Sequence, residues 1–292
     1  MEPGRKLRQA LEGSTPALGA VIGDALTARL AEMAGYDVAA MSSAPVANQL
    51  LGLPDSGMVT LAEMEFVTSR AAAACGIPLL VDAETGYGNA LSMMRTVRTF
   101  DQAGAAGVFI EDQQFPPRAA GGPVISTEEM VGKIKAAADA RVHESFLIIA
   151  RTDAAQTEGL EAGIERAQAY VDAGAEGFFF AAALTDEERA RVLEEIAAPY
   201  HFAILSGRHT YESLTGFGYS CVMAGHAPTH AGALTTLQRL EEVRRTGVSG
   251  DETWQAESAG TVLEGWERGE HGQISLFDTT ALRERYLPEG TY

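Results

Sequence analysis

Residues 78–89 read Pro-Leu-Leu-Val-Asp-Ala-Glu-Thr-Gly-Tyr-Gly-Asn, a short apolar run that ends in two carboxylates and a glycine-rich turn. Further along, residues 107–112 read Gly-Val-Phe-Ile-Glu-Asp and end in the same way. Short, continuously apolar runs are typical of strands that are buried on both faces of a parallel sheet. Because both runs finish in acids, the pattern predicts a parallel barrel whose polar residues gather at one rim.

The rest of the chain repeats this unit. Eight strands are predicted, at residues 17–22, 38–42, 79–82, 108–111, 146–151, 177–181, 202–205 and 221–223. Helical spacing predicts helices between them, for example at 24–34, 61–74, 90–103, 127–140 and 160–173. Eight such pairs close most naturally into an α/β barrel of the (β/α)8 TIM type. We therefore expect this barrel at residues 1–246 and a C-terminal helical extension at 247–292.

The composition is that of an ordinary globular protein with a large core. The chain has 292 residues, is 46% hydrophobic and 21% charged, and carries a net charge of -18. So acidic a chain is a poor partner for nucleic acid or an anionic membrane, which both attract clustered Lys and Arg. No apolar run reaches the ~18 residues of a membrane span, and no secretory leader is recognised. With Cys75 and Cys221 expected as buried, reduced thiols, the sequence predicts a cytoplasmic protein.

Three acids define a candidate metal site. Asp82, Glu84 and Glu111 follow adjacent predicted strands, and Asp82 and Glu84 share a face if their strand continues that far. Three carboxylates at one rim repel one another unless a cation lies among them. Oxygen ligands favour Mg²⁺, and Mn²⁺ could take its place. The alternative is a set of internal salt bridges, to Arg95, Arg118 or Arg151.

Other polar residues at the same rim are candidates for substrate binding and catalysis. Arg151 ends the strand at 146–151 and could grip a carboxylate with two hydrogen bonds, or could instead pair internally with Glu84 or Glu111. The turn at Ser42 and Ser43 could cradle an anion. His226 follows Gly225 after the last strand and ranks above His209. Asp55 is either a catalytic candidate or a plain turn acid.

One strand-to-helix loop, at residues 113–123, is unusually long. Most loops of this kind have about 2 to 6 residues. A long loop at the catalytic rim of a barrel is commonly a lid that closes over the substrate. A tolerated insertion is the alternative explanation.

These motifs together resemble the isocitrate lyase / phosphoenolpyruvate mutase superfamily over roughly residues 18–240. The likeness rests on Asp-Ala-Leu at 24–26, Leu-Gly-Leu-Pro-Asp at 51–55, the run at 82–89, Ile-Glu-Asp at 110–112 and Ile-Ala-Arg-Thr-Asp at 149–153. It implies a barrel with a swapped C-terminal helix, usually in a tetramer, and a Mg²⁺ ion that binds a 2-oxo acid or its enolate. By position, Asp82, Glu84 and Glu111 would hold the metal mostly through water. Ser42, Ser43 and Arg151 would bind the substrate.

Departures from the family narrow the expected activity. Lyases for isocitrate and methylisocitrate carry a Lys-Arg/Lys-Cys-Gly-His lid, whereas residues 117–121 here read Pro-Arg-Ala-Ala-Gly. Ala119 cannot transfer a proton, and the Lys-Thr-Asn-Ser lid of phosphonopyruvate-forming mutases is missing as well. Glu84 replaces the usual metal Asp. Gly225 with His226, and the run at 86–91, match a branch that decarboxylates oxaloacetate.

The resemblance therefore implies a Mg²⁺-dependent carbon–carbon lyase that acts on a 2-oxo dicarboxylic acid through an enolate, as an oxaloacetate decarboxylase does. Its catalytic residues would be Arg151, His226 and Asp55, with His226 also binding substrate. Two other functions stay open: a lyase, phosphonomutase or hydrolase for a larger 2-oxo or phosphonate substrate, and a non-catalytic barrel that binds 2-oxo acids. The expected partners are a small-molecule substrate and further copies of the chain, in a dimer or tetramer, with no nucleic acid and no membrane.

Overall fold

A computed structural model describes residues 1–117, 122–205, 207–264 and 279–287 of the chain. The chain divides into two compact units, Met1–His226 and Ala227–Tyr292. No helix in the described part of the chain combines the length and the apolar character that crossing a membrane would require.

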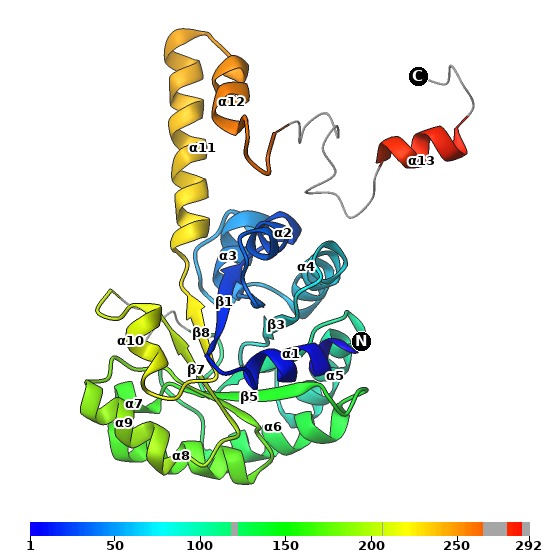
Figure 1. Cartoon of the computed structure of the whole chain (residues 1–292). Helices are drawn as coiled ribbons and strands as arrows, with labels where there is room; N and C mark the ends of the chain where they lie inside the picture. The colour runs from blue at the N-terminus through cyan, green and yellow to red at the C-terminus, as the bar shows by residue number, and fades with distance from the viewer. Residues whose placement is uncertain (118–121, 206, 265–278, 288–292) are drawn as a thin grey trace. The chain divides into compact units, whose positions relative to one another are not determined.

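Met1–His226 contains a closed barrel of eight parallel strands in chain order (Figure 1). The strands are β1 (Ala17–Ile22), β2 (Val38–Met41), β3 (Leu79–Asp82), β4 (Gly107–Glu111), β5 (Leu147–Thr152), β6 (Gly177–Phe180), β7 (Tyr200–Ile204) and β8 (Cys221–Ala224). Each begins and ends within two residues of its predicted bounds, and β8 pairs with β1 to close the ring. The predicted (β/α)8 barrel is confirmed.

Helices surround the strands, as Figure 1 shows. The longer ones in this unit are α1 (Pro3–Leu11), α2 (Ala25–Met33), α4 (Leu61–Ala74), α5 (Ala90–Gln102), α6 (Thr127–Ala140), α8 (Leu160–Asp172) and α9 (Asp186–Glu195). Capping explains where several of them begin: Thr60 and Glu63 form a reciprocal capping box on α4, and Asn89 caps α5. Shorter turns are α3 (Ser43–Val46), the π-helical turn η1 (Ala47–Leu51), α7 (Ala154–Thr157) and α10 (Tyr211–Thr215).

Aromatic side chains fill the interior of the barrel below the rim. The ring of Phe109 lies edge-on to Phe202 at 5.4 Å and to Phe179 at 6.2 Å between centroids. Gly177 leaves the space that this packing needs, because a Cβ there would lie 2.8 Å from the ring of Phe202 and 2.7 Å from Ile149. The packed interior forms a rigid floor, so a ligand cannot enter the core of the barrel.

The described residues of the unit Ala227–Tyr292 include three helices. They are α11 (Ala227–Thr246), α12 (Asp251–Ser258) and α13 (Thr279–Tyr286). No residue of α11 is buried, and its Leu234, Leu237, Leu240 and Val243 are all exposed at a spacing of three residues.

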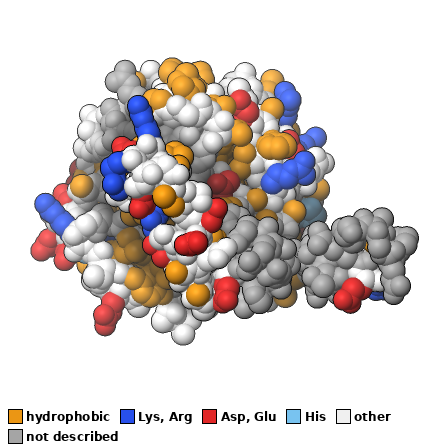
Figure 2. Space-filling model, turned by 90° about the horizontal axis from the view of Figure 1, so that it is seen from above, with side chains coloured by type: hydrophobic (Ala, Val, Ile, Leu, Met, Phe, Trp, Pro, Cys, Tyr) orange, Lys and Arg blue, Asp and Glu red, His pale blue; other side chains and the backbone are white. Residues whose placement is uncertain are grey.

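On the face drawn in Figure 2, the described Lys and Arg side chains are interspersed with Asp and Glu and form no continuous basic patch.

An ion pair between α5 and the loop after α6 makes a pH-dependent contribution to stability. Asp101 is buried and accepts hydrogen bonds from the backbone N–H groups of Val142 and His143, and its Oδ1 lies 2.6 Å from Nδ1 of His143. The hydrogen bond with Asp101 and its charge raise the pKa of His143 above its ordinary value of 6.5. A raised folded-state pKa stabilises the fold below the unfolded-state pKa, and this stabilisation is lost as pH rises through the folded-state pKa.

We therefore expect that, as pH rises above the unfolded-state pKa of about 6.5, the free energy of unfolding of the wild type falls more steeply than that of His143→Gln. The effect is modest because the His143 side chain is 44% exposed and solvent screens the pair. Urea denaturation across this pH range measures the two slopes. Equal slopes in the two proteins would show that His143 does not carry the effect.

Candidate active site

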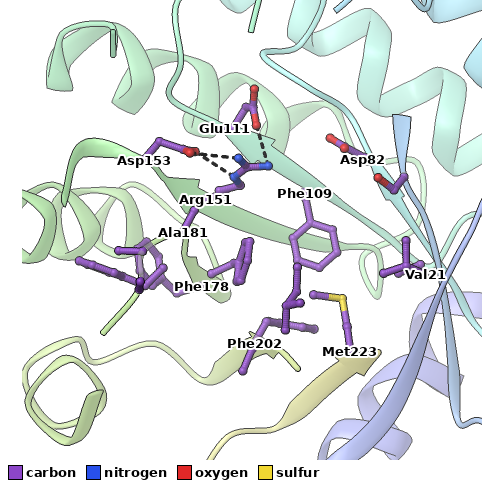
Figure 3. Close-up of a pocket in the computed structure, with 18 of the residues that line it drawn as sticks. Val21, Asp82, Phe109, Glu111, Arg151, Asp153, Phe178, Ala181, Phe202 and Met223 are labelled. Carbon is purple, nitrogen blue, oxygen red and sulfur yellow. Dashed lines mark hydrogen bonds and ion pairs between the residues drawn. The ribbon is translucent and has the colours of Figure 1, made fainter. Parts of the chain in front are cut away.

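A cavity of about 720 Å³ opens at the carboxyl ends of the barrel strands. Every site residue proposed from the sequence lines it: Ser42, Ser43, Asp55, Asp82, Glu84, Glu111, Arg151 and His226. His209 lines it as well. Figure 3 shows Asp82 facing Arg151 and Glu111 across the cavity, above the aromatic floor that includes Phe109 and Phe202. Residues spread over almost two hundred positions of sequence thus meet at one rim, as parallel strands require.

Arg151 is held by two carboxylates. Its Nη1 lies 2.9 Å from Oε2 of Glu111, while Nε and Nη2 donate to the two oxygens of Asp153 at 2.9 and 3.0 Å (Figure 3). The pairing with Glu111 follows from the register, which places Glu111 on β4 directly beside Arg151 on β5. Burial opposes the charge of Arg151, but Glu111 and Asp153 outweigh it and raise the pKa of Arg151. Of the alternatives left open by the sequence, Arg151 therefore has an internal partner in Glu111.

Arg151 is nevertheless able to bind a ligand. A guanidinium has five N–H groups, and the two carboxylates use only some of them. The side chain keeps 21% of its surface exposed, toward the cavity that it lines. Because its position is fixed from the other side, binding a carboxylate would cost little further ordering.

Asp112 accepts three hydrogen bonds and fixes the backbone that follows Arg151. Its Oδ1 accepts the backbone N–H of Asp153 at 2.9 Å, and its Oδ2 accepts the hydroxyls of Thr152 at 2.5 Å and Tyr170 at 2.9 Å. Both Asp112 and Asp153 are fully buried. Neither residue was predicted to belong to the site. The available signals were the second acid after β4 and the acid two positions after Arg151.

Glu84 reaches the site by a different route from the one expected. Strand β3 ends at Asp82, so the condition for Asp82 and Glu84 to share a strand face is not met. The backbone at Glu84 is left-handed, with φ of 51°, and its N–H donates to Oδ1 of Asp82 at 2.9 Å. This hydrogen bond compensates for a conformation that non-glycine residues rarely adopt. The tight turn brings the Glu84 carboxylate back into the cavity beside Asp82.

Two side chains from neighbouring helices fix the Glu84 turn. Nζ of the buried Lys133 on α6 donates to the carbonyl of Thr85 at 3.1 Å. The hydroxyl of Thr96 on α5 donates to the carbonyl of Gly86 at 3.1 Å. The turn is therefore tied to the helical layer, and the position of the Glu84 carboxylate depends on the packing of α5 and α6.

The buried carboxylates of Glu84 and Glu111 are not fully compensated by hydrogen bonds or by neighbouring positive charges. Oε1 of Glu84 and Oε1 of Glu111 are buried without a hydrogen-bond partner. Burial, with the charge of Asp82 added, raises the pKa of Glu84 to about 8. Burial raises the pKa of Glu111 well above its usual range, although Arg151 opposes the shift. Orphaned, buried carboxylate oxygens are costly, and a divalent cation nearby would offset that cost.

The acids do not by themselves form a closed metal cage. Among the described residues, no group of three or more His, Cys, Asp or Glu side chains is placed to hold a metal ion directly. The donor set of Asp82, Glu84 and Glu111 therefore fits a hydrated ion, such as Mg²⁺ with several retained waters, better than a fully dehydrated one. This fit rests on oxygen donors with free lone pairs at one end of the cavity.

The serine turn and His226 border the acids. The hydroxyl of Ser43 donates to Oδ2 of Asp82 at 3.2 Å, and its N–H lies 3.5 Å from the same oxygen. The N–H of Ser42 is used by the carbonyl of Ile22 at 3.1 Å, while its hydroxyl lies 3.5 Å from Nε2 of His226. Ser42 thus offers a hydroxyl, rather than an amide, to an anion. Burial, followed by the charge of Asp82, raises the pKa of the nearby Asp55 carboxyl.

The ends of the long loop after β4 are pinned together. The N–H of Gln114 donates to the carbonyl of Pro123, and that of Ile125 to the carbonyl of Asp112, both at 2.8 Å. Pro117 lines the cavity. Residues 118–121, which include Arg118 and Ala119, lie outside the described residues, so the lid stays a prediction.

Comparison with known proteins matches this geometry to one family. The family described as phosphoenolpyruvate phosphomutase matches residues 11–244. A 2-methylisocitrate lyase of Shewanella oneidensis is 39% identical over 256 residues, covering 87% of this chain and 84% of the relative. An oxaloacetate decarboxylase of Rhodopseudomonas palustris is 39% identical over 243 residues, covering 80% and 83%. The solved structure of phosphonopyruvate hydrolase with oxalate and Mg²⁺ superposes with a TM-score of 0.84 at 25% identity, over 99% of this chain and all of that one.

Proposed function

Because the chain belongs to the phosphoenolpyruvate mutase / isocitrate lyase superfamily and is a carbon–carbon lyase, we propose that it cleaves a 2-oxo dicarboxylic acid through an enolate, as an oxaloacetate decarboxylase does. One observation carries the proposal. Arg151, a donor for a substrate carboxylate, lies in the same cavity as buried acids that lack hydrogen-bond partners. The pairing of an anion site with a cation site suits a substrate whose carboxylate and ketone must be bound together.

Asp82, Glu84 and Glu111 would hold a Mg²⁺ ion, largely through water. The Mg²⁺ in the related phosphonopyruvate hydrolase structure supports this assignment, and Mn²⁺ prefers similar oxygen ligands. When bound, the cation would supply positive charge where the enolate oxygen develops negative charge. It would also neutralise the two orphaned oxygens of Glu84 and Glu111.

The chain's own residues would position the substrate, and one of them or a water molecule would protonate the enolate. The remaining N–H groups of Arg151 and the hydroxyl of Ser42 would hold the carboxylate that is kept. The bond to the other carboxylate then breaks, CO₂ departs, and the electron pair stays behind as the enolate. Departure of CO₂ requires no protein acid. Nε2 of His226, which lies beside Ser42, or a water molecule would return one proton to the carbon.

A substrate assay tests this proposal. Purified full-length protein would be incubated with oxaloacetate and with larger 2-oxo acids, with Mg²⁺, with Mn²⁺ or with excess chelator. We expect pyruvate and CO₂ from oxaloacetate, identified by mass spectrometry, and a rate at least about a hundredfold lower in chelator. Turnover of no 2-oxo acid, or turnover that chelator leaves unchanged, would falsify the proposal.

A lyase for a larger 2-oxo substrate is a second candidate, and one observation favours it. The cavity continues past Arg151 along Phe178 and Ala181, away from Asp82 (Figure 3). A four-carbon acid bound between Arg151 and the carboxylates would leave that part of the cavity unused. The same assay separates the candidates through the ratio of kcat/KM for large and small substrates.

We also propose that the protein assembles as a dimer or tetramer through its C-terminal helices. Helix α11 has no buried residue and presents Leu234, Leu237, Leu240 and Val243 to solvent, an apolar row that suits burial against another copy. Analytical ultracentrifugation of the full chain at micromolar concentration measures the assembly. A monomer alone would overturn the assignment.

A further inference from the structure

The cavity lining combines a charged part with an apolar part. The acids Glu111 and Asp153 pair with Arg151, while Asp82 accepts the N–H of Glu84 and its charge acts on Asp55. The apolar part, which we call the annex, consists of Phe180, Leu184, Val192, Leu193, Ala203 and Tyr219. Arg189 and His209 also line the cavity; Arg189 contacts Tyr219 of the annex, and both pack against Phe217. A ligand that fills both parts would thus meet an apolar wall and the cationic Arg189.

Arg189 contacts the annex through Tyr219. It lies on α9, and its Nη1 donates to the hydroxyl of Tyr219 at 2.7 Å. Its guanidinium carbon lies 5.7 Å from the centre of the Tyr219 ring and 5.8 Å from that of Phe217. These contacts are with neutral groups, so they leave the positive charge of Arg189 available to an anion. Nε is buried away from the cavity, so a ligand would be bound by the Nη groups.

His209 lies close to Arg189. Its ring lies edge-on to Phe217, 6.5 Å between centroids, so His209 and Arg189 pack against the same aromatic side chain. The nearby Asp186 lies 3.6 Å from Nε2 of His209 but is 65% exposed, so solvent screens its charge. The charge of Arg189 would attract an anion to this part of the cavity, in spite of the overall negative charge of the protein.

We propose that the annex is a subsite for the substrate's tail: the substrate is a 2-oxo acid with an apolar chain beyond its reacting carbons and a carboxylate at the end of that chain, bound by Arg189. This inference rests on the proposed function, because the reacting head of the substrate is the part that Arg151 and the acids would hold. The annex supplies affinity for the chain, since each buried methylene strengthens binding roughly fourfold. Arg189 supplies specificity for the terminal carboxylate.

Calorimetric titration with three probes tests the subsite in the full-length protein with Mg²⁺. Oxalate represents the head alone, an N-alkyl oxamate adds an apolar tail, and an N-(ω-carboxyalkyl) oxamate of equal length adds the terminal carboxylate. We expect the wild type to bind the tailed acid most tightly. Arg189→Gln should weaken binding of the tailed acid by roughly ten- to a hundredfold, and leave oxalate and the alkyl probe within about twofold.

Two further variants serve as controls. Arg191 lies on the same helix, pairs with Glu161 and Glu195 and does not line the cavity, so Arg191→Gln should leave all three affinities unchanged. Ala181→Leu narrows the entrance to the annex without touching Arg189, and should weaken both tailed probes but not oxalate. It tests the subsite independently if Arg189→Gln does not fold, which circular dichroism would reveal.

The outcomes separate the two proposals. If oxalate binds, and the tailed acid gains nothing over oxalate or loses nothing in Arg189→Gln and Ala181→Leu, the subsite is overturned and the proposed function stands. If oxalate fails to bind the wild type, the proposed function is overturned, and the subsite falls with it. Selective loss of the tailed acid in Arg189→Gln supports both.

Discussion

Replacing Asp82 with alanine is expected to abolish turnover while leaving the barrel folded. Asp82 joins three parts of the site: Oδ1 accepts the N–H of Glu84, Oδ2 accepts the hydroxyl of Ser43, and its charge contributes to the cation site. Its removal takes away a carboxylate that we propose binds the metal, and frees the left-handed turn at Glu84. We expect kcat/KM to fall by about three orders of magnitude or more, and Mg²⁺ affinity to fall with it.

The fold should survive this change because Asp82 lies at the end of β3 and faces the cavity, where water can reach the groups that it leaves. Two variants sharpen the test. Asp82→Asn keeps the shape but removes the charge, so it should lose nearly as much activity. Asp37→Ala removes an acid that likewise accepts a backbone N–H, that of Leu18, but lies just before β2, at the opposite end of the strands. It should retain full activity.

Steady-state kinetics and metal titration by calorimetry measure both effects. Turnover by Asp82→Ala at the wild-type rate would eliminate the role of the acids in catalysis. Loss of activity in Asp37→Ala of the same size would show that the measurement reports damage to the fold rather than to the site.

The strands could be predicted closely because a parallel barrel imposes a strong pattern on its sequence. Most residues of each strand are buried, so the strands read as short apolar runs, and several of them, such as β2, β3 and β5, end in or are followed by polar rim residues. The bounds of β1 and β3 were predicted to the residue. Elements of one turn, such as α7 and α10, are too short for helical periodicity to appear in the sequence, and none was predicted there.

The sequence was enough to predict which residues line the site, but not which of their atoms contact one another. Strand ends in a parallel barrel all reach one rim, so position alone placed Asp82, Glu111, Arg151 and His226 in a common cavity. Which atoms pair depends on register and rotamer. The register that sets Glu111 beside Arg151 arises only when β4 and β5 are aligned by barrel closure. The left-handed backbone conformation of Glu84 could not be predicted from the sequence either, because a non-glycine residue gives no local signal for it.

Replacing Arg151 with methionine is expected to cause the largest loss of stability of any single change at the site. The substitution leaves Glu111, 4% exposed, and Asp153, fully buried, without the cation between them. Removing one partner of a buried ion pair costs about 3–5 kcal/mol in the free energy of unfolding, because the remaining charge stays desolvated. Turnover should fall as well, since Arg151 is the group that we propose binds the substrate carboxylate.

Arg191→Met provides a matched control on the surface. Arg191 also pairs with two carboxylates, Glu161 and Glu195, but its side chain is 39% exposed and water screens its charge. Its loss should change the free energy of unfolding by only a small fraction of the Arg151 effect. Chemical denaturation measures the stability of both variants, with kcat/KM measured in parallel. Equal destabilisation by the two substitutions would contradict the argument, because it would mean that the burial of Glu111 and Asp153 adds nothing to the cost of losing their cation.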